Sequence, residues 1–128
     1  MAVRPRVLVI DDNHGFCQVV QTLLDGEGFQ VCTSGHWLDA MKTLEAEPPD
    51  AIILDLMLPD VDGFEILDWL RKSDRFKELP VVVCSALSSR EDVERARKGG
   101  ASEVVTKPCR PLDLADALRR WVKPITPS

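Results

Sequence analysis

The residues with the clearest chemical potential each follow a short apolar run of the sequence. Asp11 and Asp12 come directly after the first run, and Asp55 comes directly after the third. Ser85 follows the fourth run, and Lys107 comes shortly after the fifth. If these runs are parallel strands of one sheet, their carboxyl ends share an edge where ligands bind. Three carboxylates, a hydroxyl and an ammonium would then meet at one site.

This set of side chains favours phosphoryl chemistry. Carboxylates packed together repel one another unless they hold a proton or a cation. Oxygen ligands without Cys or His indicate a hard metal, and a few carboxylates with room for water suit Mg²⁺. A carboxylate beside Mg²⁺ and a lysine can attack phosphorus and form an aspartyl phosphate, because both cations offset the charge on the phosphoryl oxygens. The residues therefore predict a Mg²⁺-dependent phosphoacceptor site.

Each residue of this set, taken alone, also has an ordinary structural explanation. An Asp that follows a strand commonly forms a turn or caps a helix. A lone Ser at such a position is typically a loop hydroxyl, and a lone Lys is typically solvated. His14, two residues after Asp12, fits the first turn of a helix better than a phosphoryl relay or a metal ligand. The prediction therefore depends on the ordered set of positions.

Five apolar runs alternate with amphipathic segments and must position the site. The first, third and fourth runs are continuous, which is typical of central parallel strands covered on both faces. The second run is mixed, as expected at a sheet edge. We predict an α/β fold in which a five-stranded parallel sheet carries helices on both faces, a flavodoxin-like doubly wound (βα)5 arrangement. The runs are residues 7–10, 29–33, 51–54, 81–84 and 104–105.

The fourth helical segment differs from the other four. It lies between a cap at Ser88-Ser89 and the pair Gly99-Gly100, and only Val93 and Ala96 are apolar along it. We therefore expect this helix to be weakly anchored and a candidate for motion.

Length, charge and cysteine spacing limit the functions that are possible. We expect 128 residues to form one domain, residues 1–122, followed by a tail or the start of a linker at 123–128. A net charge of −5 without a basic run argues against direct binding of nucleic acid. The four cysteines lack the spacing of a zinc site. Without a signal peptide or a membrane-length apolar run, we expect a cytoplasmic protein that does not bind membranes.

The sequence at these positions resembles the receiver domain of bacterial two-component response regulators, over about residues 5 to 122. The resemblance rests on Asp11-Asp12, Asp55-Leu56-Met57-Leu58-Pro59-Asp60-Val61-Asp62-Gly63, Ser85-Ala86 and Lys107-Pro108. It implies that Asp55 is the phosphorylated aspartate. It also implies that Asp12 binds Mg²⁺ directly, that Asp11 acts through water, and that the backbone carbonyl of Met57 contributes to the metal.

The resemblance implies roles for the remaining residues as well. Ser85 would donate a hydrogen bond to the phosphoryl group, small Ala86 would leave space for it, and Lys107 would pair with a phosphoryl oxygen. The Lys107-Pro108 bond is often cis in this family. The chain departs from the family at Val104, where an aromatic ring often swings inward on activation. We therefore do not expect the usual aromatic readout.

The function implied by the resemblance is a signalling switch, not a metabolic enzyme. A histidine kinase or a histidine phosphotransfer protein would supply the phosphoryl group, and a downstream protein target or a missing output domain would receive the signal. The domain would catalyse only its own phosphorylation and slow dephosphorylation. One alternative is a degenerate receiver that acts as a phosphorylation-independent scaffold.

Two further alternatives fit the sequence less well. An aspartyl-phosphate phosphohydrolase generally needs a second Asp where this chain has Met57, together with a substrate-enclosing cap. A flavodoxin-like binding module would use a phosphate-cradling loop after the first strand, where Asp11 and Asp12 would repel a phosphate.

Overall fold

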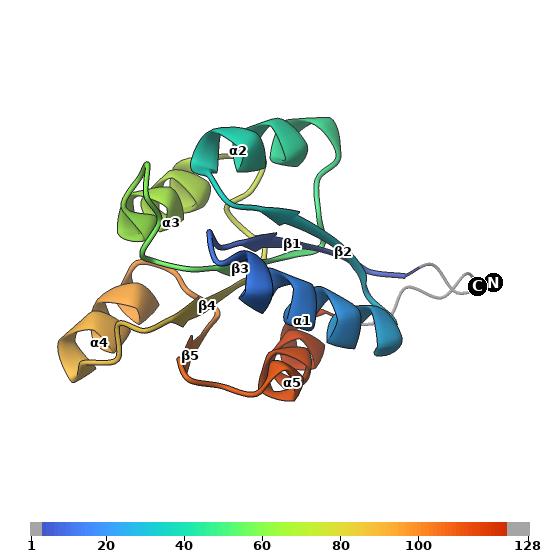
Figure 1. Ribbon diagram of the computed structural model, residues 1–128. Helices are drawn as coiled ribbons and strands as arrows, with labels where there is room; N and C mark the ends of the chain where they lie inside the picture. The colour runs from blue at the N-terminus through green and yellow to red at the C-terminus, as the bar shows by residue number, and fades with distance from the viewer. Residues whose placement is uncertain (1–3, 123–128) are drawn as a thin grey trace.

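The apolar runs form the strands of one parallel sheet in the computed structural model, which describes residues 4–122. The central strands β1, β3 and β4 are buried on both faces, as their continuous apolar sequences predict. The mixed run forms edge strand β2, in which only Ser34 is buried. The strand order is β2-β1-β3-β4-β5 (Figure 1), with β1 at Arg6–Ile10, β2 at Gln30–Ser34, β3 at Ala51–Leu54, β4 at Val81–Ser85 and β5 at Glu103–Thr106.

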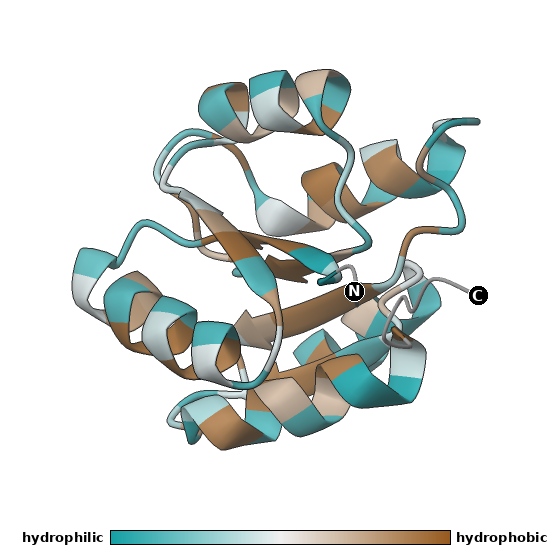
Figure 2. Ribbon diagram, turned by 90° about the vertical axis from the view of Figure 1, so that its right-hand side faces the viewer, coloured by the Kyte–Doolittle hydropathy of each residue, from teal (hydrophilic) through white to brown (hydrophobic). Residues whose placement is uncertain are grey.

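Helices cover both faces of the sheet, so the predicted doubly wound α/β fold is confirmed. The buried sides of α1 and α5 pack on one face, and those of α2, α3 and α4 pack on the other. Figure 2 shows mostly hydrophobic strands between helices of mixed character. The helices are α1 (His14–Gly26), α2 (Trp37–Ala46), α3 (Gly63–Lys72), α4 (Arg90–Lys98) and α5 (Pro111–Trp121). The predicted tail at 123–128 lies outside the described residues.

Helix α4 is held by few contacts, in agreement with the sequence. Ser89 caps its first turn and Gly99 ends it, but Ala96 is its only buried residue. A second anchor comes from Arg95, whose guanidinium lies 3.9 Å from the ring centroid of Phe64 in α3. Among residues 4–122, no helix has both the length and the apolar character needed to cross a membrane.

Arg71, near the end of α3, ties together three segments of the chain. Its Nε donates to the carbonyl of Gly100 at 2.8 Å, which fixes the turn between α4 and β5. Its Nη1 donates to the carbonyls of Lys77 at 3.0 Å and Leu79 at 2.7 Å, in the segment that leads to β4. Burial lowers the pKa of Arg71 from its ordinary value, yet the guanidinium stays charged, so these bonds are charge-assisted.

Replacing Arg71 by Ala is expected to lower the free energy of unfolding by about 3 kcal/mol, because hydrogen bonds to charged groups contribute roughly 1.5–3 kcal/mol and partly buried carbonyls lose their donor. Urea denaturation of both proteins measures the difference. Lys72→Ala is the control, since Lys72 is exposed and pairs with Asp68 one turn away, a contact that contributes about 0.5 kcal/mol or less. Equal losses for the two variants would contradict this role of Arg71.

Candidate functional site

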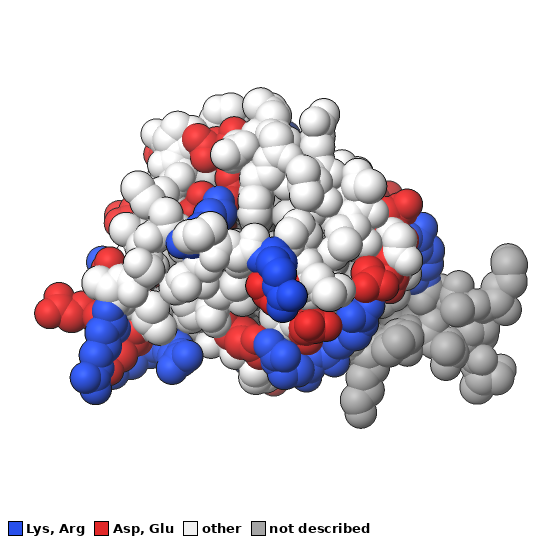
Figure 3. Space-filling view, turned by 60° about the horizontal axis from the view of Figure 1, so that its bottom comes forward, with Lys and Arg blue, Asp and Glu red and all other residues white. Residues whose placement is uncertain are grey.

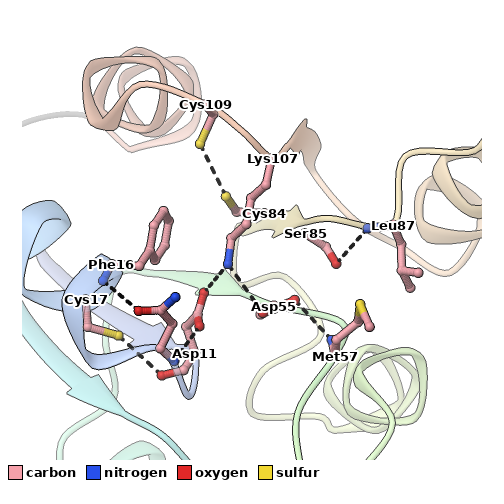
Figure 4. A network of polar contacts seen from close by, with 11 residues as sticks. Asp11, Phe16, Cys17, Asp55, Met57, Cys84, Ser85, Leu87, Lys107 and Cys109 are labelled. Atoms are coloured by element: carbon pink, nitrogen blue, oxygen red, sulfur yellow. Dashed lines mark hydrogen bonds and ion pairs between the residues drawn. The ribbon is translucent and has the colours of Figure 1, made fainter.

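Strand register brings the predicted residues to one edge of the sheet. Ile10 and Leu54 are partners in the parallel pair β1–β3, so Asp11 and Asp55, the residues that follow, leave the sheet side by side. Ser85 is paired with Thr106 across β4–β5, so Lys107 leaves the sheet next to Ser85. The side chains of Asp11, Asp55 and Lys107 converge at the carboxyl edge, and Ser85 lies beside them (Figure 4).

Three carboxylates form a candidate metal site. Asp11, Asp12 and Asp55 each offer an oxygen, and these atoms lie within 4.8 Å of one another. Asp11 and Asp55 are only 3% and 6% exposed, whereas Asp12 is exposed at the mouth. A donor set made of oxygen alone and open to water on one side fits Mg²⁺ better than a softer metal. The three predicted carboxylates therefore lie together, with negative charge and with one side open to water.

Lys107 lies among these carboxylates. Its Nζ is 2.7 Å from Asp11 Oδ2 and 3.4 Å from Asp55 Oδ2. Burial lowers the pKa of Lys107, but the hydrogen bond to Asp11 and the charge of Asp55 raise it, and the net pKa is above the ordinary value. The ammonium therefore stays charged at neutral pH and offsets part of the negative charge of the site.

Backbone turns orient two of the carboxylates. Asp11 Oδ1 accepts a hydrogen bond from the Asn13 amide at 2.9 Å, and Asp55 Oδ1 accepts one from the Met57 amide at 3.0 Å. Among residues 4–122, Asp55 Oδ2 has only the long contact with Lys107, so this oxygen is the more weakly held of the two carboxylate oxygens. Met57 itself lies in the loop after β3 and is 54% exposed.

Ser85 ends β4 and is 1% exposed. Its Oγ accepts a hydrogen bond from the Leu87 amide at 3.3 Å, and within the described residues no hydrogen bond joins it to Asp55. Ser85 is thus next to the carboxylates but turned to its own loop. The neighbouring Ala86 is exposed, and the Lys107–Pro108 peptide bond is cis.

Two other residues singled out in the sequence have clear positions. His14 is the exposed first residue of α1, and no hydrogen bond or ion pair between residues 4 and 122 joins it to the carboxylates. Val104 is partly buried in β5 and packs against the cluster of α2, α3 and α4. Neither position adds a reactive group to the site.

The sequence did not reveal the apolar and sulfur-containing residues around the site. The ring of Phe16, in the first turn of α1, lies 4.2 Å from Lys107 Nζ and stabilises the ammonium. Cys17 Sγ donates to the carbonyl of Asp11 at 3.3 Å. The sulfur atoms of Cys84 and Cys109 are 3.6 Å apart. No spacing rule could have predicted these contacts, because they depend on how α1 and α5 pack on the sheet.

Known proteins resemble this chain over most of its length. The family model of the response regulator receiver domain matches residues 7–119. The polar-differentiation response regulator DivK of Brucella anthropi is 29% identical over 102 residues, which are 80% of this chain and 83% of that protein. The structure of chemotaxis protein CheY4 of Vibrio cholerae superposes with a TM-score of 0.86 at 27% identity, covering 94% of this chain and 100% of that one. The structure of the receiver domain of Francisella response regulator 1452 superposes with a TM-score of 0.86 at 29% identity, covering 92% of this chain and 96% of that one.

Proposed function

Because this chain belongs to the response regulator receiver domain family, we propose that it accepts a phosphoryl group on Asp55 in a Mg²⁺-dependent reaction and then changes its protein-binding surface. One observation carries the proposal: Asp55 is a buried carboxylate beside two other carboxylates and an ammonium, at the ligand-binding edge of the sheet. Receiver domains are signalling switches, and we place this chain among them as the domain at residues 1–122.

The residues of the site have separate roles in the proposed reaction. The carboxylates of Asp11, Asp12 and Asp55 and the backbone carbonyl of Met57 would hold Mg²⁺, with Asp11 acting through water. When bound, the metal supplies positive charge against the carboxylates and the phosphoryl oxygens. An oxygen of Asp55 attacks phosphorus as the bond to the leaving group breaks, and the leaving group departs with the electron pair.

Lys107 and Ser85 act on the transferred group. The Lys107 ammonium, held by Asp11 in this structure, moves to a phosphoryl oxygen and offsets its charge. The Ser85 hydroxyl, which now accepts from the Leu87 amide, turns to donate to another phosphoryl oxygen. Both residues are near the acceptor, because their backbones already flank the carboxylates.

The phosphodonor is proposed to be a histidine kinase or a histidine phosphotransfer protein that docks on α1 and the start of α5. An apolar depression there is lined by Gln18, Val19, Thr22, Leu23 and Pro111. Val19 is 56% exposed, and nearby Leu112 is 38% exposed. Both helices begin at the edge that carries Asp55, so a phosphohistidine presented here is close to the acceptor.

Charge supports a protein partner and not a nucleic acid. The net charge is −5, and on the face shown in Figure 3 basic and acidic side chains are intermixed without a continuous basic area. We place the protein in the cytoplasm, where histidine kinases present their phosphohistidine.

The signal is proposed to leave through α4 and its neighbours β5 and α5. Val104 cannot act as a swinging ring, so the change must involve backbone and helix displacement. Helix α4 suits this role, because it is anchored mainly by Ala96 and by the stacking of Arg95 on Phe64. The downstream partner, a separate protein or an attached output domain, would bind the displaced surface.

We expect the purified protein to gain one phosphoryl group from acetyl phosphate when Mg²⁺ is present and none when EDTA removes the metal, because without a cation the carboxylates repel the donor. Intact mass measures the gain, and peptide mapping after borohydride reduction of the acyl phosphate identifies the residue. Asp12→Asn should need a higher Mg²⁺ concentration for the same gain, since it removes one oxygen anion from the metal site.

A folded protein that gains no phosphoryl group from acetyl phosphate or from a phosphohistidine protein would reject the proposal. The scaffold alternative, which requires no phosphorylation, would then be preferred. Turnover of a phosphorylated small molecule without a stable acyl phosphate would instead favour a phosphohydrolase.

A further inference from the structure

Two cysteines that the proposed phosphoryl transfer does not use lie against each other beside Lys107 (Figure 4). Cys84 immediately precedes Ser85 in β4, and Cys109 follows the Lys107–Pro108 peptide. Their Sγ atoms are 3.6 Å apart and unbonded. Because a disulfide has a sulfur–sulfur distance of about 2.0 Å, a shift of roughly 1.6 Å would join them.

We propose that hydrogen peroxide converts Cys84 and Cys109 into a reversible intramolecular disulfide, and that this bond slows phosphoryl transfer to Asp55. In reducing compartments such bonds are transient and serve as redox sensors. The disulfide site is inferred from the geometry of the two sulfur atoms alone. The effect of the disulfide on phosphoryl uptake rests on the function proposed above.

Exposure determines which sulfur reacts first. Cys109 is partly exposed, whereas Cys84 is 0% exposed. Burial, together with the neighbouring Cys109, raises the pKa of the Cys84 thiol, so little thiolate forms there. An oxidant from solvent therefore meets Cys109, and Cys84 is placed to resolve the oxidised product.

The two steps balance in atoms and electrons. The Cys109 sulfur attacks one oxygen of hydrogen peroxide, so that an S–O bond forms and the O–O bond breaks, and the released hydroxide leaves as water with the thiol proton. The Cys84 thiol then attacks the Cys109 sulfur as its proton passes to the departing oxygen, so that the S–S bond forms and the S–O bond breaks. The second hydroxide leaves as water with the Cys84 proton. Two thiols are oxidised by two electrons, and one peroxide is reduced to two waters.

The bond would constrain the segments that handle the phosphoryl group. The loop it closes, residues 84–109, contains Ser85, α4, β5 and Lys107. Drawing Cys109 toward β4 also draws the adjoining Lys107 backbone, and Lys107 must move from Asp11 to the phosphoryl oxygen during transfer. Because a displacement of about 1 Å in a reactive group can cost up to about 100-fold in rate, we expect uptake to slow by about tenfold.

The other two cysteines permit a clean experiment. Cys32 is exposed on edge strand β2, so Cys32→Ser removes the sulfur most able to link two molecules. Cys17 is buried and hydrogen-bonded to the carbonyl of Asp11, so it is left unchanged. The parent for all measurements is therefore the full chain with Cys32→Ser. The two test variants add either Cys109→Ser or Cys84→Ala to this parent.

The first measurement is intact mass after treatment with hydrogen peroxide. The parent should lose the mass of two hydrogen atoms and regain it with dithiothreitol, and a non-reducing digest should contain one peptide pair joined through Cys84 and Cys109. Neither test variant should form this pair. Oxygen addition without a disulfide, or a disulfide that survives in either variant, would overturn the site.

The second measurement is the rate of phosphoryl uptake from acetyl phosphate and Mg²⁺ by the reduced, oxidised and re-reduced parent. We expect the oxidised form to be about tenfold slower and re-reduction to restore the rate, while peroxide leaves the rate of Cys109→Ser unchanged. A disulfide without any change of rate would reject the regulatory effect. If the reduced parent takes up nothing, the proposed function fails and the regulatory effect fails with it, but the mass measurement still decides the modification site.

Discussion

Replacing Asp55 by Asn is expected to abolish phosphoryl uptake while leaving the fold intact. The amide of Asn is neutral and is not a nucleophile toward phosphorus, so transfer from acetyl phosphate should fall to background. Asn can keep the hydrogen bond that Asp55 Oδ1 accepts from the Met57 amide. Its loss of charge also relieves repulsion from Asp11 and Asp12. Intact mass after incubation with acetyl phosphate and Mg²⁺ measures the uptake, and thermal unfolding checks the fold.

Asp74→Asn provides the matched control, because its carboxylate is fully exposed. Asp74 lies between α3 and β4, in the segment that precedes β4 and not after the carboxyl end of a strand. This variant should gain one phosphoryl group at the wild-type rate. Uptake by Asp55→Asn at the wild-type rate, or a loss of uptake in both variants, would show that the acceptor is elsewhere. Peptide mapping of the phosphorylated form would then identify it.

Replacing Gly63 by Ala is expected to have the largest effect on stability, a loss of at least about 3 kcal/mol in the free energy of unfolding. A Cβ at this position would lie 2.3 Å from Leu56 Cα, 2.8 Å from the Leu56 carbonyl and 2.9 Å from the Asp55 carbonyl. All three atoms are backbone and cannot rotate away. The hydrogen bond from the Gly63 amide to the Leu56 carbonyl, 3.0 Å long, pulls the start of α3 against the same segment.

The clash in Gly63→Ala would also reach the proposed phosphoacceptor, since the backbone that must shift is that of Asp55 and Leu56. Urea denaturation measures the stability, and uptake from acetyl phosphate measures the site, with both expected to fall. Gly26→Ala is the matched control. Gly26 ends α1 with no atom within 4 Å of an added Cβ, so Ala there should stabilise the protein by about 0.5 kcal/mol. A Gly63→Ala protein as stable as wild type would contradict the close packing of Gly63 against the backbone of Asp55 and Leu56.

The main features of the fold could be predicted because they depend on local patterns. Continuous apolar runs of four residues are typical of strands buried on both faces, and this pattern identified β1, β3 and β4. The scarcity of apolar residues between Ser89 and Gly99 also predicted the poor anchoring of α4. Helix capping was predictable only in part. Asp62 caps α3 as its position suggests, but the first turn of α2 is capped by Asp60, which accepts from the Trp37 amide at 2.9 Å across 23 residues.

The sequence by itself determined which reactive groups this protein has and at which edge they meet. In a parallel sheet the residues that follow buried strands must emerge together, so Asp11, Asp55 and Lys107 were brought together by the fold class alone. Only the tertiary structure decided what these groups contact. The Lys107–Asp11 bond joins residues 96 positions apart, and the Cys84–Cys109 contact joins residues 25 apart. Such contacts depend on side-chain direction and on how the helices pack against the sheet. The periodicity of the sequence does not encode them, because periodicity records which face a residue occupies and not which neighbour the residue meets on that face.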